Sequence, residues 1–522
     1  MDDRLKLSEV AHLNVPDRDR SKSPSPADSL ASSATDISML PITGRGHRKD
    51  EYGLTSHLVF AIAAAALGSS FQHGYNTGVV NAPEKLVQEF INETYSARFG
   101  ERADKQTITI IYSIMVSIFC VGGMAGALMT AYIAEKFGRK KGLLLNNVFV
   151  FIAAAFMGFS KLCRSYEMLI FGRFFIGLNS GLNAGLAPMY LTEIAPLHLR
   201  GAVGTIYQLV VTISILVSQV LGLPEILGTS DRWPFLFAMT IVPAIFMLVT
   251  MPLCPESPKY ILITQGRDVA AQKSLTWLRG TIEVHDEMDE MRAEYESMKL
   301  VPKVTLYEMW HNPSLRQPLF IAVAVMLSQQ LSGINAIIFF STGIFGDAGL
   351  KEDEALYATL GMGSINVVMT IVSLILVEKS GRRTLHLVGL AGMCISTILL
   401  TLCLKLKDEA HWLSYFSIVL VIFFVIMFAT GPGSIPWFLV TELFGHGARP
   451  IATSIAVAVN WSANFIVGLC FLPLKNLIGE YIFLIFSALL VVFLIFTYKK
   501  VPETKNKTAE EIAALFRQKA YQ

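Results

Sequence analysis

Charged residues are scarce in this chain of 522 residues, and they lie between long apolar runs instead of being spread through them. Only 16% of the residues are charged and 53% are hydrophobic, which indicates a membrane protein with several spans. The formal net charge is +2, and no basic run alternates with aromatic residues outside the apolar runs. This balance excludes nucleic acid as a partner and leaves membrane lipid as the expected surroundings.

Cysteine is rare as well. The six cysteines lie in or beside apolar runs and show no C-x-x-C spacing, so we expect neither a disulfide nor a metal site. No run pairs a nucleophile with histidine or groups metal ligands, which argues against an enzyme and against a cofactor. Residues 1–50 contain no cleavable signal peptide, so we expect the first apolar run to start membrane insertion itself.

The apolar runs predict twelve membrane-spanning helices in two sets of six. The first set covers residues 57–80, 108–132, 143–162, 167–190, 204–224 and 234–253. The second set covers residues 318–343, 355–377, 384–404, 412–438, 450–472 and 480–498. The expected fold is an all-α polytopic membrane protein built from two six-helix bundles.

Basic residues in the short connections set the orientation, because lysine and arginine resist translocation. They concentrate between spans two and three, between spans eight and nine, and in the long middle segment, which places these segments and both termini in the cytoplasm. The predicted parts are a disordered cytoplasmic tail at 1–54, a first bundle at 55–254, short cytoplasmic connector helices at 255–317, a second bundle at 318–500 and a cytoplasmic tail at 501–522. In this topology, the triplet that begins at Asn92 is the only Asn-x-Ser/Thr triplet on the extracellular side. We therefore predict glycosylation of Asn92.

Three charged motifs of the first half return in the second half at nearly constant spacing. The matched sets are Glu193 and Arg200 with Glu442 and Arg449, residues 135–141 with 378–383, and residues 255–259 with 502–505. Such self-similarity indicates a duplication. A membrane protein with two similar halves is typical of a transporter whose site lies between them.

The repeated charges sit at membrane edges, where an unpaired charge is costly. Glu193 is expected to pair with Arg200 or with Arg139, and Glu442 with Arg449 or with the basic turn of Arg382 and Arg383. We expect such pairs to hold the halves together when the cytoplasmic side is shut. The alternative is that the charges only anchor helices and fix topology. The full gating set is Glu193, Arg200, Arg139, Glu378, Arg382, Arg383, Glu442 and Arg449.

Several motifs add to the charged turns. They are Gly-Arg-Phe at 172–174, Pro-Met-Tyr-Leu-Thr-Glu at 188–193, Pro-Glu-Ser-Pro at 255–258, Gln-Gln-Leu-Ser-Gly-Ile-Asn at 329–335, Gly-Pro-Gly-Ser-Ile-Pro-Trp at 431–437 and Pro-Glu-Thr-Lys at 502–505. Jointly they resemble the sugar porter branch of the major facilitator superfamily, and most of all the animal facilitative glucose transporters. The resemblance covers about residues 55–518. It implies the major facilitator fold, a plasma membrane location, alternating access and a hexose cargo, D-glucose foremost, with fructose and galactose as other candidates.

The chain also departs from that family. Ala429 stands where a glutamate is common before the Gly-Pro-Gly of the tenth helix, and Phe339 and Phe340 stand where tyrosines are common. Met326 begins the triplet in which many glucose-selective members have Gln-Leu-Ser. These changes leave the preference for glucose over fructose open.

An uncharged hexose has hydroxyls that both donate and accept hydrogen bonds, and amide side chains do the same without bringing charge into the membrane. The amides within spans are Gln208, Gln329, Gln330, Asn335, Asn366, Asn460 and Asn464. The resemblance implies a sugar-facing role for these positions and for Trp437. Gln329, Gln330 and Asn335 point in three directions on a regular helix, so we expect a distortion at Gly333. The alternative is that buried amides only join neighbouring helices.

Trp437 follows Gly431, Pro432, Gly433 and Pro436, which loosen a helix, so we expect the tenth span to bend. An indole at the bend can lie against the C–H face of a sugar while its N–H binds a hydroxyl, and its movement can close the inner exit. Ordinary packing of one aromatic residue is the alternative.

Coupling to protons requires a titratable group in the path. Proton-linked sugar porters carry an aspartate in the first helix where this chain has Asn76, which cannot titrate. His73 in the same span is the remaining candidate for taking up a proton. We therefore expect a uniporter. The alternatives are a proton-coupled sugar symporter and a sugar sensor that transports little, although no long signalling extension follows the last span.

Overall fold

The apolar runs form helices in the computed structural model, which describes residues 53–522, and no strand occurs among these residues. The tail predicted at 1–54 lies almost wholly outside the described residues. The part described below, from Leu54 to Gln522, is one compact unit.

Nine segments of the described chain are long and apolar enough to cross a membrane. One of them, Arg449–Lys500, has 52 residues and reverses at Gly479, where φ is +65°, so it makes two crossings. Two more crossings are less uniform: the first span is interrupted by the π-helical turn Ala66–Ser70, and the fourth contains Arg173. Together these segments are the twelve predicted spans.

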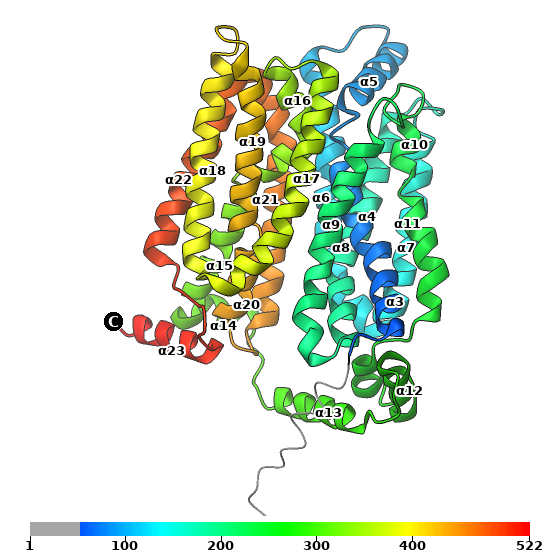
Figure 1. Ribbon diagram of the computed structural model, residues 1–522, viewed down its shortest axis with the longest axis vertical. Coiled ribbons are helices and arrows are strands. Elements are labelled where there is room, and N and C mark those ends of the chain that lie inside the picture. The colour runs from blue at the N-terminus through cyan, green and yellow to red at the C-terminus, as the bar shows by residue number, and fades with distance from the viewer. Residues whose placement is uncertain (1–52) are drawn as a thin grey trace, which may run out of the picture. The chain divides into compact units, whose positions relative to one another are not determined.

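The first bundle contains six crossings. They are α3 (Ser56–Ala65) continued by α4 (Phe71–Gly78), α6 (Lys105–Lys136), α7 (Arg139–Gly158), α8 (Tyr166–Ile194), α9 (Arg200–Leu221), and α10 (Trp233–Ala238) with α11 (Ile241–Thr250). The extra helix α5 (Glu84–Phe99) lies at one end of this bundle (Figure 1).

The second bundle repeats the plan. Its crossings are α15 (Pro313–Gln330) with α16 (Ile334–Asp347), α17 (Glu352–Lys379), α18 (Arg382–Lys405), α19 (Trp412–Thr430) with α20 (Ile435–Leu443), α21 (Arg449–Ile478) and α22 (Ile482–Lys500). The helices α12 (Asp268–Arg279), α13 (His285–Lys299) and α14 (Leu306–His311) join the bundles, and α23 (Ala509–Ala520) follows the last crossing. Figure 1 shows these short helices at the end opposite to α5. We call the two ends the connector end and the far end.

The two bundles pack along two helix pairs, α6 with α21 and α9 with α17. Within the first bundle, α6 and α8 approach closely because glycines face each other: a Cβ at Gly181 would lie 2.1 Å from the carbonyl oxygen of Gly123. Small residues of this kind allow helix backbones to touch inside a membrane.

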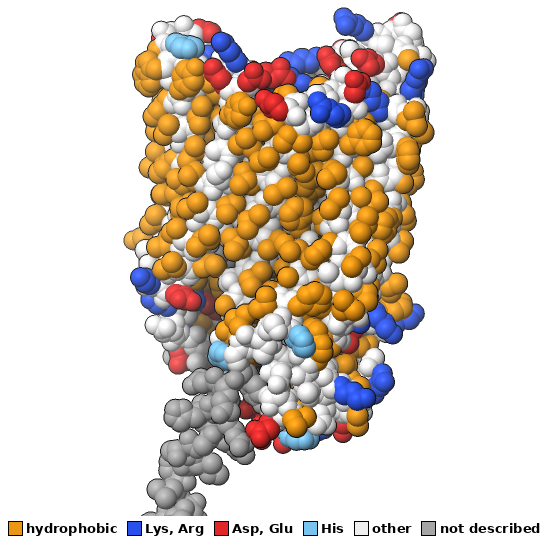
Figure 2. Space-filling view, turned by 45° about the vertical axis from the view of Figure 1, so that its right-hand side comes forward, with side chains coloured by type: hydrophobic (Ala, Val, Ile, Leu, Met, Phe, Trp, Pro, Cys, Tyr) orange, Lys and Arg blue, Asp and Glu red, His pale blue; other side chains and the backbone are white. Residues whose placement is uncertain are grey.

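The surface agrees with a membrane location. Figure 2 shows hydrophobic side chains over the middle of one face and charged side chains at its two ends. Exposed apolar residues such as Leu128, Phe171 and Val492 would be unfavourable in water but favourable in lipid.

Candidate functional site

A buried amide network lies where α15, α16 and α21 meet. Asn460 donates to Oε1 of Gln329 over 2.7 Å, and Gln330 donates to Oδ1 of Asn460 over 3.2 Å. Asn335 donates to Oε1 of Gln330 over 2.5 Å. All four side chains are at most 8% exposed. Asn464, one turn further along α21, is also buried, and its Oδ1 has no hydrogen-bond partner.

A break in the seventh span brings these amides together. The α15 helix ends at Gln330 and α16 begins at Ile334, with Gly333 between them at a φ of +94°. Glycine adopts this left-handed conformation without steric cost. The predicted distortion is therefore present, and it turns Asn335 toward Gln330.

The tenth span is broken as predicted. The α19 helix ends at Thr430, α20 begins at Ile435, and the Nε2 of Gln329 donates to the carbonyls of Pro432 and Gly433 over 2.9 and 3.0 Å. The break frees these carbonyls from the helix ladder, and the amide of span seven satisfies them. The two broken helices are thus tied to each other.

The other predicted sugar contacts lie outside this network. Gln208 on α9 and Trp437 on α20 are exposed, Trp437 by 40%, and Asn366 on α17 is half-buried. These side chains are accessible to a ligand, whereas the amides of the network are held in place by one another.

The first span contains the polar residues His73 and Asn76, and His73 contacts the second bundle. His73 is half-buried, its Nδ1 lies 2.8 Å from the hydroxyl of Tyr207, and its ring stacks with Trp461 of α21 at a centroid distance of 6.0 Å. Asn76 donates to the hydroxyl of Thr240 over 2.9 Å. The sequence predicted neither Tyr207 nor Trp461 as part of the site, although both aromatic residues lie next to predicted amides in the chain.

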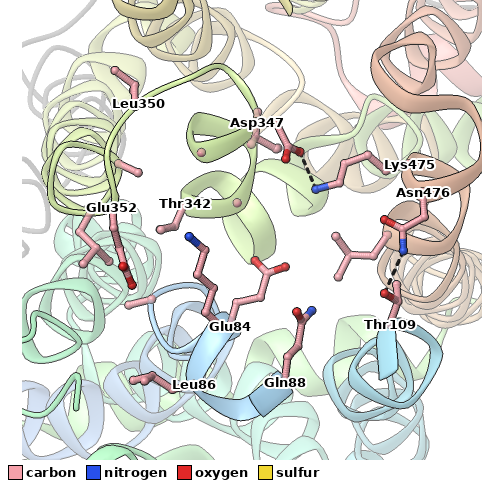
Figure 3. A pocket seen from close by; sticks show the side chains of 18 of the residues that line it. Glu84, Leu86, Gln88, Thr109, Thr342, Asp347, Leu350, Glu352, Lys475 and Asn476 are labelled. Carbon is pink, nitrogen blue, oxygen red and sulfur yellow. Dashed lines mark hydrogen bonds and ion pairs between the residues drawn. The ribbon is translucent and has the colours of Figure 1, made fainter. Parts of the chain in front are cut away.

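The far end is closed by hydrogen bonds between the bundles. Asn81 donates to the hydroxyl of Ser341 over 2.6 Å and accepts from the backbone N–H of Thr342 over 3.0 Å. Asn476 donates to the hydroxyl of Thr109 over 2.9 Å. A cavity of about 610 Å³ lies beside these contacts, and Glu84 points into its middle (Figure 3).

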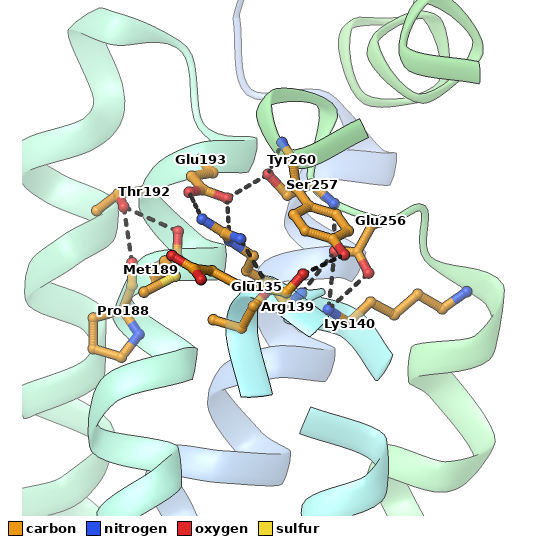
Figure 4. Close-up of polar contacts among 11 residues, drawn as sticks. Glu135, Arg139, Lys140, Pro188, Met189, Thr192, Glu193, Glu256, Ser257 and Tyr260 are labelled. Carbon is orange, nitrogen blue, oxygen red and sulfur yellow. Dashed lines mark hydrogen bonds and ion pairs between the residues drawn. The ribbon is translucent and has the colours of Figure 1, made fainter. Parts of the chain in front are cut away.

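A charged cluster occupies the connector end of the first bundle (Figure 4). Arg139, at the start of α7, lies 3.0 Å from Glu193 at the end of α8, and both side chains are at most 16% exposed. Glu256 accepts hydrogen bonds from the backbone N–H groups of Arg139 and Lys140 over 3.1 and 3.0 Å. Ser257 donates to Oε2 of Glu193. The positive end of a helix dipole thus faces the carboxylate of Glu256.

The second bundle contains the same cluster. Arg382 lies 3.1 Å from Glu442, and Glu503 accepts from the backbone N–H groups of Arg382 and Arg383 over 2.9 and 3.3 Å. Thr504 donates to Glu442 as Ser257 does to Glu193. The duplication seen in the sequence is therefore a duplication of one hydrogen-bonded structure.

The structure decides between the two expected pairings. Glu193 and Glu442 bind the arginines of the basic turns, and the pairing with Arg200 and Arg449 is not the one formed within the described chain. Arg449 instead donates to the carbonyls of Thr441 and Phe444, because it caps the end of α20.

The remaining members of the gating set differ from one another. Arg200 is half-buried with its Nε unpartnered, Glu378 is exposed, and Arg383 donates to the carbonyl of Tyr498 over 2.6 Å. Among the described residues each cluster joins segments of one half only, so the expectation that these pairs hold the two halves together is wrong for this conformation: the carboxylates bind the basic turn of their own half, which lies next to them. A role in gating stays a prediction. The sequence missed the capping roles of Glu256 and Glu503, although their recurrence in the repeat was the signal.

The predicted glycosylation site lies on α5 at the far end. Asn92 is half-buried, and Thr94 of the same triplet is 5% exposed. Its modification stays a prediction.

A family model, two relatives and one solved structure that resemble this chain all belong to sugar transporters. The family model described as sugar (and other) transporter matches residues 61–516. The chain is 48% identical to solute carrier family 2, facilitated glucose transporter member 1 from Gallus gallus, over 89% of this chain and 94% of that protein. It is 46% identical to member 3 from Mus musculus, over 90% of this chain and 94% of that protein. The inward-open conformation of the xylose transporter XylE from E. coli has a TM-score of 0.73 at 25% identity and covers 88% of this chain and 99% of that chain.

Proposed function

This chain belongs to the sugar transporter family, and we propose that it carries a hexose, D-glucose foremost, across the plasma membrane by facilitative uniport. The protein is a transporter with the major facilitator fold and not an enzyme. Its two bundles expose the sugar site alternately to one side of the membrane and to the other. The two relatives named above are facilitated glucose transporters, and their similarity to this protein covers nearly the whole chain. This similarity favours glucose as the cargo.

The buried amide network is the observation that carries the proposal for the site. It contains donors and acceptors from Gln329, Gln330, Asn335 and Asn460 but no charge, which suits a neutral polyol. Its internal hydrogen bonds fix the amides before a ligand arrives, so less conformational entropy is lost on binding. Gln208, Asn366, Asn464 and Trp437 complete the proposed sugar contacts.

We assign the connector end to the cytoplasm and the far end to the extracellular side, because basic residues gather in the connections of the connector end. Both termini are then cytoplasmic, and Asn92 lies on the extracellular side, where glycosylation is expected. Uniport is favoured over proton symport because Asn76 occupies the first-helix position and is engaged with Thr240.

The test uses the purified full chain in sealed liposomes. Radiolabelled D-glucose should enter much faster than L-glucose, because amide hydrogen bonds read the stereochemistry of hydroxyls. Competition by D-fructose and D-galactose then defines the range of cargo. Equal rates for D- and L-glucose, at the level of empty liposomes, would overturn the proposal.

A further inference from the structure

Glu84 is a buried carboxylate at the far end, where the two bundles meet. It is the first residue of α5, it is 9% exposed, and its Oε2 has no hydrogen-bond partner. It takes no part in the amide network or in the charged clusters. A buried charge without a partner is costly, so its presence requires an explanation.

The carboxylate packs against the opposite bundle. A Cβ built on Gly343 of α16 would lie only 2.8 Å from Oε2 of Glu84, so this oxygen faces the bare Cα of a glycine. On the side of Gly343 no other heavy atom fits, so no side chain or backbone group of α16 can donate a hydrogen bond to Oε2 there, while the carboxylate borders the cavity on its other side. The contact lies beside the hydrogen bonds of Asn81 with Ser341 and Thr342, which join the two bundles at the far end.

The charges around Glu84 do not neutralise it. Lys475 of α21 lies 2.7 Å from Asp347 of α16 and is engaged there (Figure 3). Lys85 follows Glu84 on α5 and is exposed. The other charged residues that line the cavity are Lys105 of α6, Glu352 of α17, Lys407 before α19 and Glu480 before α22.

These surroundings favour the protonated form. Burial raises the pKa of Glu84 to about 7 from 4.5, with Lys475 opposing the shift, Asp347 adding to it and Lys85 opposing it.

We propose that Glu84 is a proton-binding site on the extracellular face and that proton binding there stabilises the conformation in which this face is closed. The proposal rests on the orientation and the alternating access given above. When the far end opens, Glu84 leaves Gly343 and meets water, where a carboxylate is readily charged. The closed state therefore binds the proton more tightly than the open state, and acid on the outside favours closure.

The size of the effect follows from linkage. With a pKa of about 7 in the closed state and 4.5 when solvated, lowering the external pH from about 8 to about 6 raises the ratio of closed to open molecules about tenfold. Below about pH 4.5 both states are protonated and the effect levels off. External acid should accordingly slow sugar uptake at the step in which the far end reopens.

Distances between spin labels at the far end test the proposal. The labels are attached at Glu101→Cys and Asp408→Cys, two exposed positions on different bundles, after the exposed Cys163 and Cys470 have been changed to serine. In liposomes, the short-distance population should rise relative to the long-distance one by about tenfold between pH 8 and pH 6. In Glu84→Gln the ratio should be high at both pH values, because the amide mimics the protonated acid.

The matched control is Glu89→Gln, an exposed carboxylate on the same helix, which should keep the full response to pH. Glu84→Asp provides a second variant: its shorter side chain withdraws from Gly343, so the midpoint of the response should move to lower pH. An unresponsive parent protein, or a pH response retained in Glu84→Gln, would overturn the proposal. D-glucose flux is measured on the same samples. Absent flux would count against the transport proposal, whereas normal flux without a pH response would count against the role of Glu84 alone.

Discussion

Replacement of Gln330 by leucine tests the amide network at its centre. Gln330 donates to Gln329 over 3.3 Å and to Asn460 over 3.2 Å, and it accepts from Asn335 over 2.5 Å. Leucine fills a similar volume but provides none of these bonds. The partners remain buried and lose a hydrogen bond each.

Gln330 is also one of the amides proposed to bind the sugar, so its loss leaves a sugar hydroxyl without a partner in a buried site. An unmet buried polar group costs about 1–3 kcal/mol, and part of this cost is recovered when water reaches it. We expect about 1.4–2.8 kcal/mol to appear as weaker sugar binding, which corresponds to about a tenfold to hundredfold rise in the dissociation constant for D-glucose.

The assay is equilibrium binding of D-glucose together with flux in liposomes, and thermal unfolding reports whether the variant is folded. The control is Gln265→Leu, an exposed glutamine of the connector, which should leave binding unchanged. A double-mutant cycle with Asn460→Ala should give a coupling energy of about 0.5–3 kcal/mol, since the two side chains are in contact. A folded Gln330→Leu protein with parental affinity would show that Gln330 does not contribute to sugar binding.

Three further predictions concern the gates and the coupling. Trp437→Ala should lower uptake about fivefold to tenfold while surface expression persists, because stacking on a sugar ring contributes about 1 kcal/mol. The control is Trp412→Ala, which changes an exposed residue at the far end. Unchanged uptake in Trp437→Ala would exclude the proposed role of this side chain. Glu193→Gln and Glu442→Gln each leave an arginine at the membrane edge without its charge partner, so the helix ends of that bundle should shift and the population open to the cytoplasm, measured by spin-label distances at the connector end, should change. An unaltered population would show that the charges only anchor helices. A protonophore should leave D-glucose uptake unchanged, whereas proton influx on addition of sugar would establish symport.

Much of the fold could be predicted because its determinants are local. Apolar runs long enough to cross a bilayer define spans, and glycine or proline within them defines breaks. Gly333 and the segment at 431–437 therefore indicated where spans seven and ten are interrupted, and the structure contains both breaks. The convergence of Gln330 and Asn335 followed from the first of these breaks.

Other features depend on which helices pack against each other. Neighbouring residues in the sequence do not determine this packing. From the sequence, Glu193 can pair with either Arg139 or Arg200. Arg139 is its partner because α7 packs against α8. Arg173 appeared in the sequence only as part of a motif, yet it is fully buried and donates to the carbonyl of Asn76 over 2.6 Å. Glu84 shows the same limit, because its unusual surroundings arise from Gly343 in the opposite bundle.

The two bundles are proposed to enclose an uncharged hexose and to release it on either side without an energy source. Equilibrium exchange in sealed liposomes measures this property: the purified protein should bring internal D-glucose to the external concentration and no higher, and unlabelled D-glucose inside should accelerate entry of the labelled sugar. Accumulation above the external concentration under an imposed proton gradient, or the absence of any D-glucose exchange by folded protein, would exclude facilitative uniport.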